Sequence, residues 1–315
     1  MQRNTHFDDN RIIWRDEYSG QYDVPPLGYS EEFDLQWRLG LEGKDGYYRH
    51  PGACVDDDYI ADRVYEWTGH HPLGVEHYDA SCGARPLDHP IDVFLIKGKE
   101  CADIGCGMGR WTRTLQKIGA ASVLSVDMSE SALQSVRRYN DRVMKANIMT
   151  LIREYPELKE QFDFTVFWGV AMCTHDPLQA FLNAAATVKP GGTLYMMVYA
   201  PEGMHGASIT KYQRRKFHRL RTVSERLAMV DNIFNRRWDS DYPFIENVKN
   251  LWRNMRRLPK GSKLGLLDAL EPFYNWVIPL EVIEGWMAKG NFSNMKLLNE
   301  RENPKCAYHV LAIKG

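Results

Sequence analysis

The sequence predicts an α/β fold, with a mostly parallel sheet that carries helices on both faces. Between residues 98 and 200, short apolar runs alternate with amphipathic stretches, a pattern typical of strands connected by helices. A glycine-rich segment, Gly105–Gly109, follows the first apolar run, and an acidic residue, Asp127, ends the second. Because parallel sheets bind ligands at the carboxyl ends of their strands, these observations together indicate a nucleoside-containing cofactor at that edge.

The elements are expected in a regular order along this region. The predicted strands are 99–104, 122–127, 142–147, 162–169 and 193–200, and the predicted helices are 109–118, 130–140, 149–157 and 177–187. Lys189-Pro-Gly-Gly192 is interpreted as the turn before the fifth strand, because proline and glycine end a helix sharply. After Ala200 the alternation stops, and it resumes with a helix at 280–289 and strands near 294–302 and 307–314.

The glycine spacing distinguishes between cofactors. Gly105, Gly107 and Gly109 allow a tight turn and let a ligand approach without meeting a Cβ. The dinucleotide fingerprint Gly-x-Gly-x-x-Gly would need its third glycine at the position of Arg110. The carboxylate of Asp103, just before the loop, would repel a pyrophosphate but suits a cationic amino group. The spacing therefore favours a cofactor with an amino group over a dinucleotide.

The pattern Asp103-x-Gly-x-Gly-x-Gly109 resembles motif I of the class I S-adenosylmethionine (SAM) dependent methyltransferases of the small-molecule type. Three further segments are similar to the family's fourth strand and following loop, its fifth strand and its last helix: Phe162–Pro177, Val188–Tyr195 and Pro279–Phe292. The resemblance implies a Rossmann-like, seven-stranded, mostly parallel sheet with an antiparallel strand beside the fifth. It also implies SAM as cofactor and S-adenosylhomocysteine as product.

Carried over by position, the resemblance implies a set of cofactor-binding residues. Asp103 and the glycine loop would hold the methionine end, Asp127 the ribose and Met128 the adenine. Asn147 departs from the family, which usually has an acidic residue there, but its side-chain oxygen can still accept from the adenine amino group. Arg110 is interpreted either as a partner of the cofactor carboxylate or as a solvated residue at a helix start. The expected set is Asp103, Gly105, Cys106, Gly107, Gly109, Arg110, Asp127, Met128, Asn147, Ile148, Trp168 and Gly169.

A general base is needed only if the methyl acceptor must lose a proton. His175, in the loop after the fourth strand, is the candidate base, and Asp176 would orient it. The alternative is that Asp176 caps the next helix while His175 only lines the loop. Tyr199 and His205 are further candidates. No metal site is expected, because the cysteines and histidines lack metal-ligand spacing.

The segments outside the core are expected to cover the active site. Residues 1–95 are interpreted as an irregular N-terminal extension with a helix from Tyr59 to Trp67, capped by the acidic run Asp56–Asp58. Residues 96–200 would form the SAM-binding core, and residues 276–315 its last helix and closing strand pair. Residues 201–275 would form a basic helical insertion or lid after the fifth strand.

The insertion carries two basic stretches within a chain of net charge −1. Lys211–Arg226 holds seven Lys or Arg and one acid, and apolar residues recur at helical spacing from Phe217 to Phe234. We therefore expect one amphipathic helix with a basic outer face. The second stretch, Lys249–Lys263, has three arginines beside Trp252. Both stretches favour a small anionic substrate, with RNA as the alternative.

Composition places the chain among ordinary globular proteins, with 44% hydrophobic and 26% charged residues. No apolar run reaches the length of a membrane span and no apolar signal region is present, so we expect a cytoplasmic protein without a membrane partner. The six scattered cysteines are expected to be reduced thiols. The expected function is methyl transfer to an oxygen or nitrogen of a small, anionic metabolite or sugar. The alternatives are an RNA methyltransferase and a catalytically silent SAM-binding scaffold.

Overall fold

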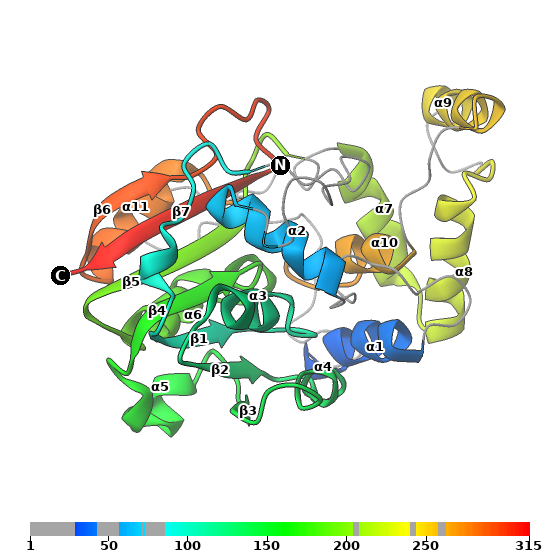
Figure 1. Cartoon of the computed structure of the whole chain (residues 1–315). Coiled ribbons are helices and arrows are strands. Elements are labelled where there is room, and N and C mark those ends of the chain that lie inside the picture. The colour runs from blue at the N-terminus through cyan, green and yellow to red at the C-terminus, as the bar shows by residue number, and fades with distance from the viewer. Residues whose placement is uncertain are drawn as a thin grey trace.

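The computed structural model describes residues 29–42, 57–70, 72, 86–203, 208–239, 244–257 and 263–315 (Figure 1). Its centre is a seven-stranded sheet in the order β3-β2-β1-β4-β5-β7-β6. The strands are β1 (Glu100–Ile104), β2 (Ser122–Asp127), β3 (Val143–Lys145), β4 (Phe162–Trp168), β5 (Val188–Tyr199), β6 (Phe292–Leu297) and β7 (Ala307–Lys314). The first five run parallel, and β7 is antiparallel to both β5 and β6. The expected Rossmann-like α/β fold is confirmed.

Helices lie on both faces of this sheet. They are α1 (Tyr29–Glu42), α2 (Asp57–Thr68), α3 (Arg110–Ile118), α4 (Glu130–Val136), α5 (Leu151–Glu154), α6 (Pro177–Ala186), α7 (Ser208–Arg219), α8 (Val223–Phe234), α9 (Phe244–Met255), α10 (Lys263–Leu270) and α11 (Leu280–Lys289). On one face, Trp67 of α2 and Trp111 of α3 pack against Phe164 of β4. On the other, Phe181 of α6 and Trp286 of α11 pack against the sheet.

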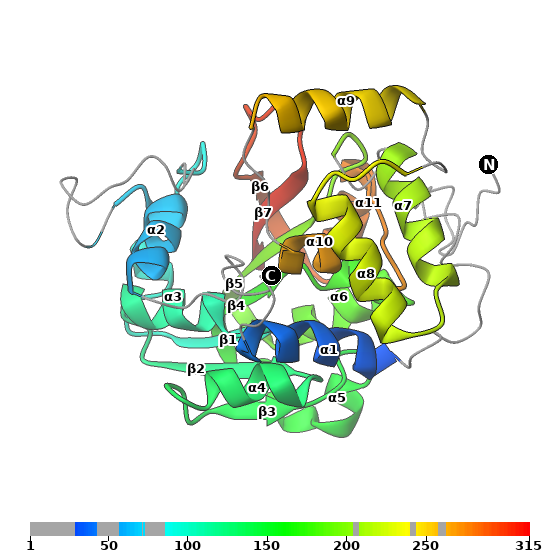
Figure 2. The same cartoon turned by 90° about the vertical axis from the view of Figure 1, so that its right-hand side faces the viewer.

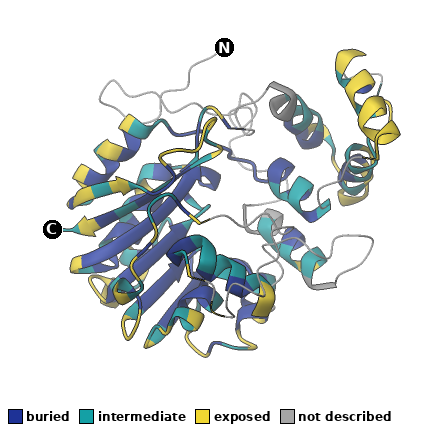
Figure 3. Ribbon diagram, turned by 45° about the horizontal axis from the view of Figure 1, so that its top comes forward, coloured by how far each residue is buried: buried dark blue, intermediate teal, exposed yellow. Residues whose placement is uncertain are grey.

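The strands are buried on both faces, as parallel strands between two helical layers must be. In β4, Phe164 and Val166 belong to one core cluster, whereas Phe167 belongs to the other, because successive side chains point to opposite faces. Figure 3 shows the buried interior of the sheet in dark blue. Two predicted helices are shorter than expected: 130–140 ends at Val136, and 149–157 is reduced to Leu151–Glu154 followed by a single turn at Pro156–Leu158.

The prediction of a turn at Lys189-Pro-Gly-Gly192 was wrong, because this segment lies inside β5, which begins at Val188. The pairing of β4 with β5 shifts register between Phe162 and Phe164, so the segment forms an irregular start of the strand. A Cβ on Gly192 would lie 2.9 Å from the carbonyl oxygen of Lys189. Glycine is therefore needed there for close backbone approach within a strand.

The N-terminal segment was predicted to be irregular except for one helix, but α1 is a second helix of 14 residues. It contacts α4 on one side and α10 on the other (Figure 2). The expected helix at 59–67 is α2, which begins earlier, with Asp57 and Asp58 in its first turn. Asp56 lies outside the described residues. Asp57 pairs with Arg113 of α3 over 3.2 Å, so α2 is tied to the helix beneath it.

The basic insertion forms separate helices where one was predicted. The chain breaks between α7 and α8, because Thr222 caps α8: its hydroxyl accepts from the backbone N–H of Glu225, whose carboxylate accepts from the backbone N–H of Thr222. Phe217 of α7, Val230 of α8 and Leu267 of α10 share one apolar cluster.

The predicted basic outer face was wrong for two arginines, since Arg214 and Arg226 are each only 1% exposed. The guanidinium of Arg214 donates to backbone carbonyls at the end of α10, those of Ala269 (3.0 Å), Leu270 (3.2 Å), Pro272 and Phe273 (3.4 Å). It therefore closes the carboxyl end of a helix. Among the described residues, no helix has the length and apolar character to span a membrane.

Candidate functional site

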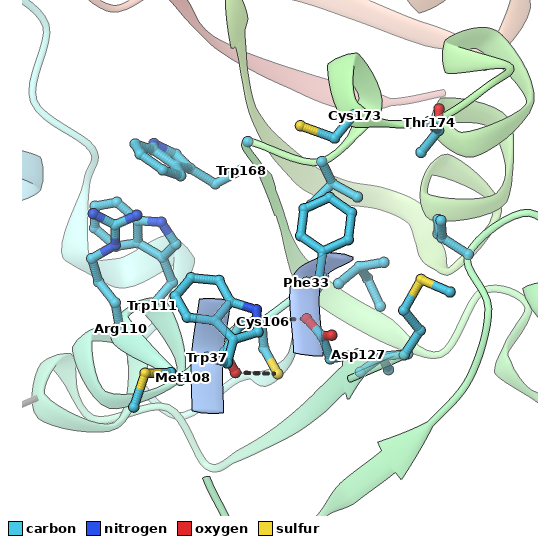
Figure 4. Close-up of a pocket in the computed structure, with 18 of the residues that line it drawn as sticks. Phe33, Trp37, Cys106, Met108, Arg110, Trp111, Asp127, Trp168, Cys173 and Thr174 are labelled. Carbon is cyan, nitrogen blue, oxygen red and sulfur yellow. Dashed lines mark hydrogen bonds between the residues drawn. The ribbon is translucent and has the colours of Figure 1, made fainter. Parts of the chain in front are cut away.

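A pocket opens at the carboxyl ends of β1, β2 and β4 (Figure 4). The connections after β1 and β4 leave in opposite directions along the sheet, and such a switch point leaves a crevice at the strand ends. The empty space of the pocket is about 1070 Å³, including the part open to solvent.

The glycine loop forms the floor of this pocket. Gly105 and Gly107 both have positive φ, +76° and +52°, which side-chain-bearing residues rarely adopt. A Cβ on Gly105 would collide with Val170, and one on Gly107 would lie 3.1 Å from the ring of Trp37. The loop is held in place because Gly105 N–H and Cys106 N–H both donate to the carbonyl of Val126. Gly109 also has positive φ and faces Tyr139, away from the lining.

Asp127 lies at the end of β2 and lines the pocket. One carboxylate oxygen accepts from Gly107 N–H (2.8 Å) and the other from Ser129 N–H (2.9 Å). Burial raises the pKa of Asp127, and these backbone donors act against the rise. A carboxylate offers about four acceptor positions, so the group can also accept from a ligand hydroxyl.

Asp103 is placed differently from Asp127. It is 1% exposed and lies outside the pocket lining, in β1, where it accepts from the Thr112 hydroxyl over 2.8 Å. Burial raises the pKa of Asp103 to about 7, against the lowering effect of the Thr112 hydrogen bonds. Its assignment to a cofactor amino group stays a prediction.

Most of the remaining predicted cofactor residues line the pocket, and Asn147 does not. Met128, Ile148, Trp168 and Gly169 line the pocket with Cys106 and Arg110. Asn147 is exposed and lies outside the lining, with its side-chain oxygen accepting from Met149 N–H over 2.9 Å. Its role at an adenine ring also stays a prediction.

Helix α1 supplies a wall that the sequence did not predict. Phe33 and Trp37, one turn apart, both line the pocket, and Figure 4 shows their rings on the side of Asp127 and Cys106. Asp34 fastens α1 there, because its carboxylate accepts from the Ser129 hydroxyl (2.9 Å) and from Ser131 N–H (3.0 Å). The apolar pair at i and i+4 is the signal in the sequence that would have indicated this helix.

Arg110 begins α3 and is held among aromatic rings. Its guanidinium carbon lies 4.2 Å from the ring centre of Trp168 and 5.1 Å from that of Trp111. One guanidinium nitrogen donates to the Tyr59 hydroxyl over 3.3 Å. The interpretation as a solvated helix-start residue is therefore wrong, because the guanidinium is stacked on Trp168.

Polar groups from segments distant in the sequence also line the pocket. Tyr199 at the end of β5, Thr174 after β4 and Asp268 of α10 line it. The carboxylate of Asp268 accepts from the side-chain amide of Gln36 over 2.8 Å. Burial, followed by the nearby charge of Asp268, raises the pKa of Tyr199 well above its usual range. Its hydroxyl therefore stays protonated and can donate a hydrogen bond.

His175 and Asp176 do not line this pocket. Asp176 caps α6 by accepting from Gln179 N–H over 2.8 Å, which confirms the capping interpretation. His175 is exposed, and its ring centre lies 6.2 Å from that of Tyr274. Its catalytic role stays a prediction, and His205 lies outside the described residues.

The described cysteines, Cys101, Cys106, Cys173 and Cys306, are free thiols, whereas Cys54 and Cys82 lie outside the described residues. Burial raises the pKa of Cys106 well above the ordinary thiol value, so this pocket residue is not a thiolate nucleophile. In the part of the chain that the structure describes, no cluster of three His, Cys, Asp or Glu side chains is placed to hold a metal ion.

Part of the chain is similar to known methyltransferases. Residues 101–192 match a family described as a methyltransferase domain. A ubiquinone biosynthesis O-methyltransferase of Coxiella burnetii is 34% identical over 105 residues, which are 32% of this chain and 44% of that protein. A tRNA U34 carboxymethyltransferase of Pseudomonas aeruginosa is 27% identical over 131 residues, 41% of this chain and 40% of that protein. The chain thus spans less than half the length of the curated relatives it matches.

The alignments with two solved structures cover a larger share of the chain. A SAM-dependent methyltransferase from Archaeoglobus fulgidus is 12% identical and covers 70% of this chain and 89% of its own, with a TM-score of 0.43. One from Mesorhizobium loti is 15% identical and covers 70% of this chain and 92% of its own, with a TM-score of 0.41.

Proposed function

We propose that this chain, whose residues 101–192 match a methyltransferase domain, uses SAM as cofactor and methylates an oxygen or nitrogen of a small molecule. The observation that carries the proposal is a pocket whose lining combines the glycine loop and Asp127 with polar groups from distant segments, Tyr199 and Asp268. A cofactor and a methyl acceptor would thus lie in contact within one pocket.

The glycine loop and Asp127 fit the cofactor. Gly107 lies so close to Trp37 that a Cβ would be 3.1 Å from its ring, so glycine lets the loop and α1 meet at the pocket. Asp127 would accept from the ribose hydroxyls, and Met128 and Ile148 offer apolar surface to the adenine. Bound SAM supplies an electrophilic methyl group, and the protein contributes mainly alignment and exclusion of water. Phe33 and Trp37 would serve that exclusion.

Asp268 is the residue we assign as general base. It lines the pocket and is oriented by Gln36, whereas His175 lies outside the lining. The Tyr199 hydroxyl stays protonated, so it would orient the acceptor by donating a hydrogen bond. Asp268 would take the acceptor's proton as the new bond to carbon forms.

The lining also indicates the class of acceptor. Aromatic rings of Phe33, Trp37 and Trp168 surround the cavity, which favours a small acceptor with an apolar or aromatic body. Among the lining residues Arg110 is the only one with a permanent positive charge, so an anionic group on the acceptor would pair there. The basic insertion supports an anionic substrate less than its composition suggested, because Arg214 and Arg226 are buried.

Calorimetric titration tests the cofactor half of the proposal. The protein is expected to bind SAM and S-adenosylhomocysteine and to bind NAD negligibly, since Arg110 stands where a pyrophosphate-binding loop needs glycine. Comparable affinity for NAD would overturn the assignment of the pocket.

A further inference from the structure

Helix α9 presents its apolar side chains to solvent. Phe244, Met255 and Ile245 are 72%, 68% and 58% exposed, and Val248, Leu251 and Trp252 are exposed as well. We call these six residues the α9 stripe. Their spacing along a helix of 12 residues places them on one side of it. Figures 1 and 2 show α9 at the outer edge of the molecule, away from the central sheet.

Asn247 and Asn254, on the edge of α9 beside Leu251, attach it to the rest of the protein. Asn247 is 2% exposed, and its side-chain amide bonds to both the N–H (3.0 Å) and the carbonyl (2.6 Å) of Asp239. Two helical turns further along, the side-chain amide of Asn254 donates to the carbonyls of Asn235 (3.5 Å) and Arg236 (3.3 Å). A surface helix ordinarily buries its apolar side, whereas α9 is fastened by amides and turns the apolar side outward. Contiguous exposed apolar surface of this kind marks an interaction site.

The charges beside the stripe indicate what covers it. Lys249, Arg253 and Arg256 follow the stripe along one edge of the helix, and all three are exposed. The guanidinium carbon of Arg256 lies 4.5 Å from the ring centre of Trp252. The acid of α9, Glu246, pairs with Lys249 over 2.7 Å. The surface therefore combines aromatic and aliphatic side chains with a net positive border.

We propose that α9 lies flat on an anionic lipid surface, with the stripe among the lipid chains and the basic border at the head groups. This composition is that of interfacial amphipathic helices, in which tryptophan and phenylalanine enter the boundary and Lys and Arg meet anionic lipid. A second copy of the chain fits less well, because it would bring two positive borders together. RNA would engage the arginines but leave the aliphatic part of the stripe exposed.

A helix that lies on a lipid surface does not cross the membrane. The proposal therefore agrees with the finding that no helix among the described residues could span a membrane. The sequence expectation of no membrane partner considered spanning segments alone. The proposal also stands apart from the chemistry of the pocket, since no residue of α9 is among those that line it.

Vesicle flotation of the full chain tests the proposal. Vesicles of phosphatidylcholine with phosphatidylglycerol are expected to float the protein, and vesicles of phosphatidylcholine alone to float it far less. Phe244→Ser should lower the partition coefficient about tenfold or more, because it removes a large apolar group from the lipid. Phe94→Ser is the matched control, since Phe94 is also 72% exposed but lies outside α9, and it should leave binding unchanged.

A charge pair completes the test. Arg253→Glu should weaken flotation with the anionic vesicles, whereas Arg138→Glu, an exposed change of the same charge on another surface, should not. Calorimetry with SAM should give the wild-type affinity for all four variants, which separates this proposal from that of the pocket. No flotation of the wild type, or equal loss in Phe94→Ser and Phe244→Ser, would overturn it. The proposal would also be overturned if the wild type bound no vesicles and Phe244→Ser lost either a dimer, seen in sedimentation, or RNA binding. The first result would assign α9 to a second copy of the chain, and the second would assign it to RNA.

Discussion

Gly107 donates its backbone N–H to a carboxylate oxygen of Asp127 over 2.8 Å, and this bond joins the glycine loop after β1 to the end of β2. The same carboxylate accepts from Ser129 N–H, at the start of α4. One side chain therefore organises three segments of the pocket and still faces into it. The loop and the expected ribose acceptor form a single preorganised unit.

Asp127→Ala should weaken SAM binding roughly 10- to 100-fold, because it removes both a ligand acceptor and the anchor of the loop. Calorimetry measures the effect. Asp163→Ala is the control: this carboxylate, in β4, bonds Lys189 and Glu100 N–H and lies outside the pocket lining. Wild-type affinity in a folded Asp127→Ala protein would contradict the role of the carboxylate.

The raised pKa of Asp103 predicts a pH-dependent stability. The folded protein holds the carboxyl neutral up to about pH 7, whereas the unfolded chain ionises it near its ordinary value of 3.8. The contribution of the Asp103 carboxyl to the free energy of unfolding is therefore fully present below pH 3.8 and is lost as the pH rises towards 7. Asp103→Asn should raise the free energy of unfolding at pH 8 by on the order of 2 kcal/mol, with a smaller gain at pH 5. Denaturant unfolding at both pH values checks this, and an equal gain at both would refute it.

The same variant tests whether Asp103 meets the cofactor. If its carboxylate holds the cofactor amino group, SAM affinity should rise with pH as Asp103 ionises, and Asp103→Asn should lose this rise. An unchanged affinity in Asp103→Asn, measured by calorimetry across this range, would show that the carboxylate acts only inside the protein.

Asp268→Asn should lower kcat about 10²- to 10⁴-fold while SAM affinity stays near the wild-type value, because only proton removal is lost. His175→Ala is the competing variant, and it should keep most of its activity. The reverse result in steady-state kinetics would return the base to His175 and reject Asp268.

Arg214→Ala should lower the free energy of unfolding by about 2–4 kcal/mol, because the carbonyls that Arg214 bonds at the end of α10 would be left buried without a donor. Arg219→Ala, an exposed change on the same helix, should have little effect. Denaturant unfolding distinguishes the two. If Arg214→Ala were as stable as the wild type and raised KM instead, the arginine would serve substrate binding.

The sequence predicted the sheet and the place of the glycine loop and Asp127 because these depend on local patterns. Strand spacing, the glycine loop and Asp127 lie within one continuous stretch. The rest of the lining depends on contacts between distant segments: Gln36 and Asp268 are 232 positions apart, and no local pattern indicates that they meet. Likewise, composition cannot tell a solvated arginine from Arg214, whose carbonyl partners begin 55 residues later.

One difference was visible in the sequence and was missed. Thr222-Val-Ser-Glu225 has the spacing of a capping box, which indicates a helix start in the middle of the predicted single helix. The apolar pattern from Phe217 to Phe234 continues across the break, so periodicity alone favoured one helix. A helix-start signal should therefore outweigh continuous periodicity in such a case.

The central claim is methyl transfer to a small molecule in the pocket that Asp127 and Asp268 share. The most direct measurement incubates the protein with methyl-labelled SAM and a cell extract, then separates small molecules from RNA and protein. The account predicts label in the small-molecule fraction with the wild type, and at least about 10²-fold less with Asp268→Asn. Label in the RNA fraction, or bound SAM without any transfer, would contradict it.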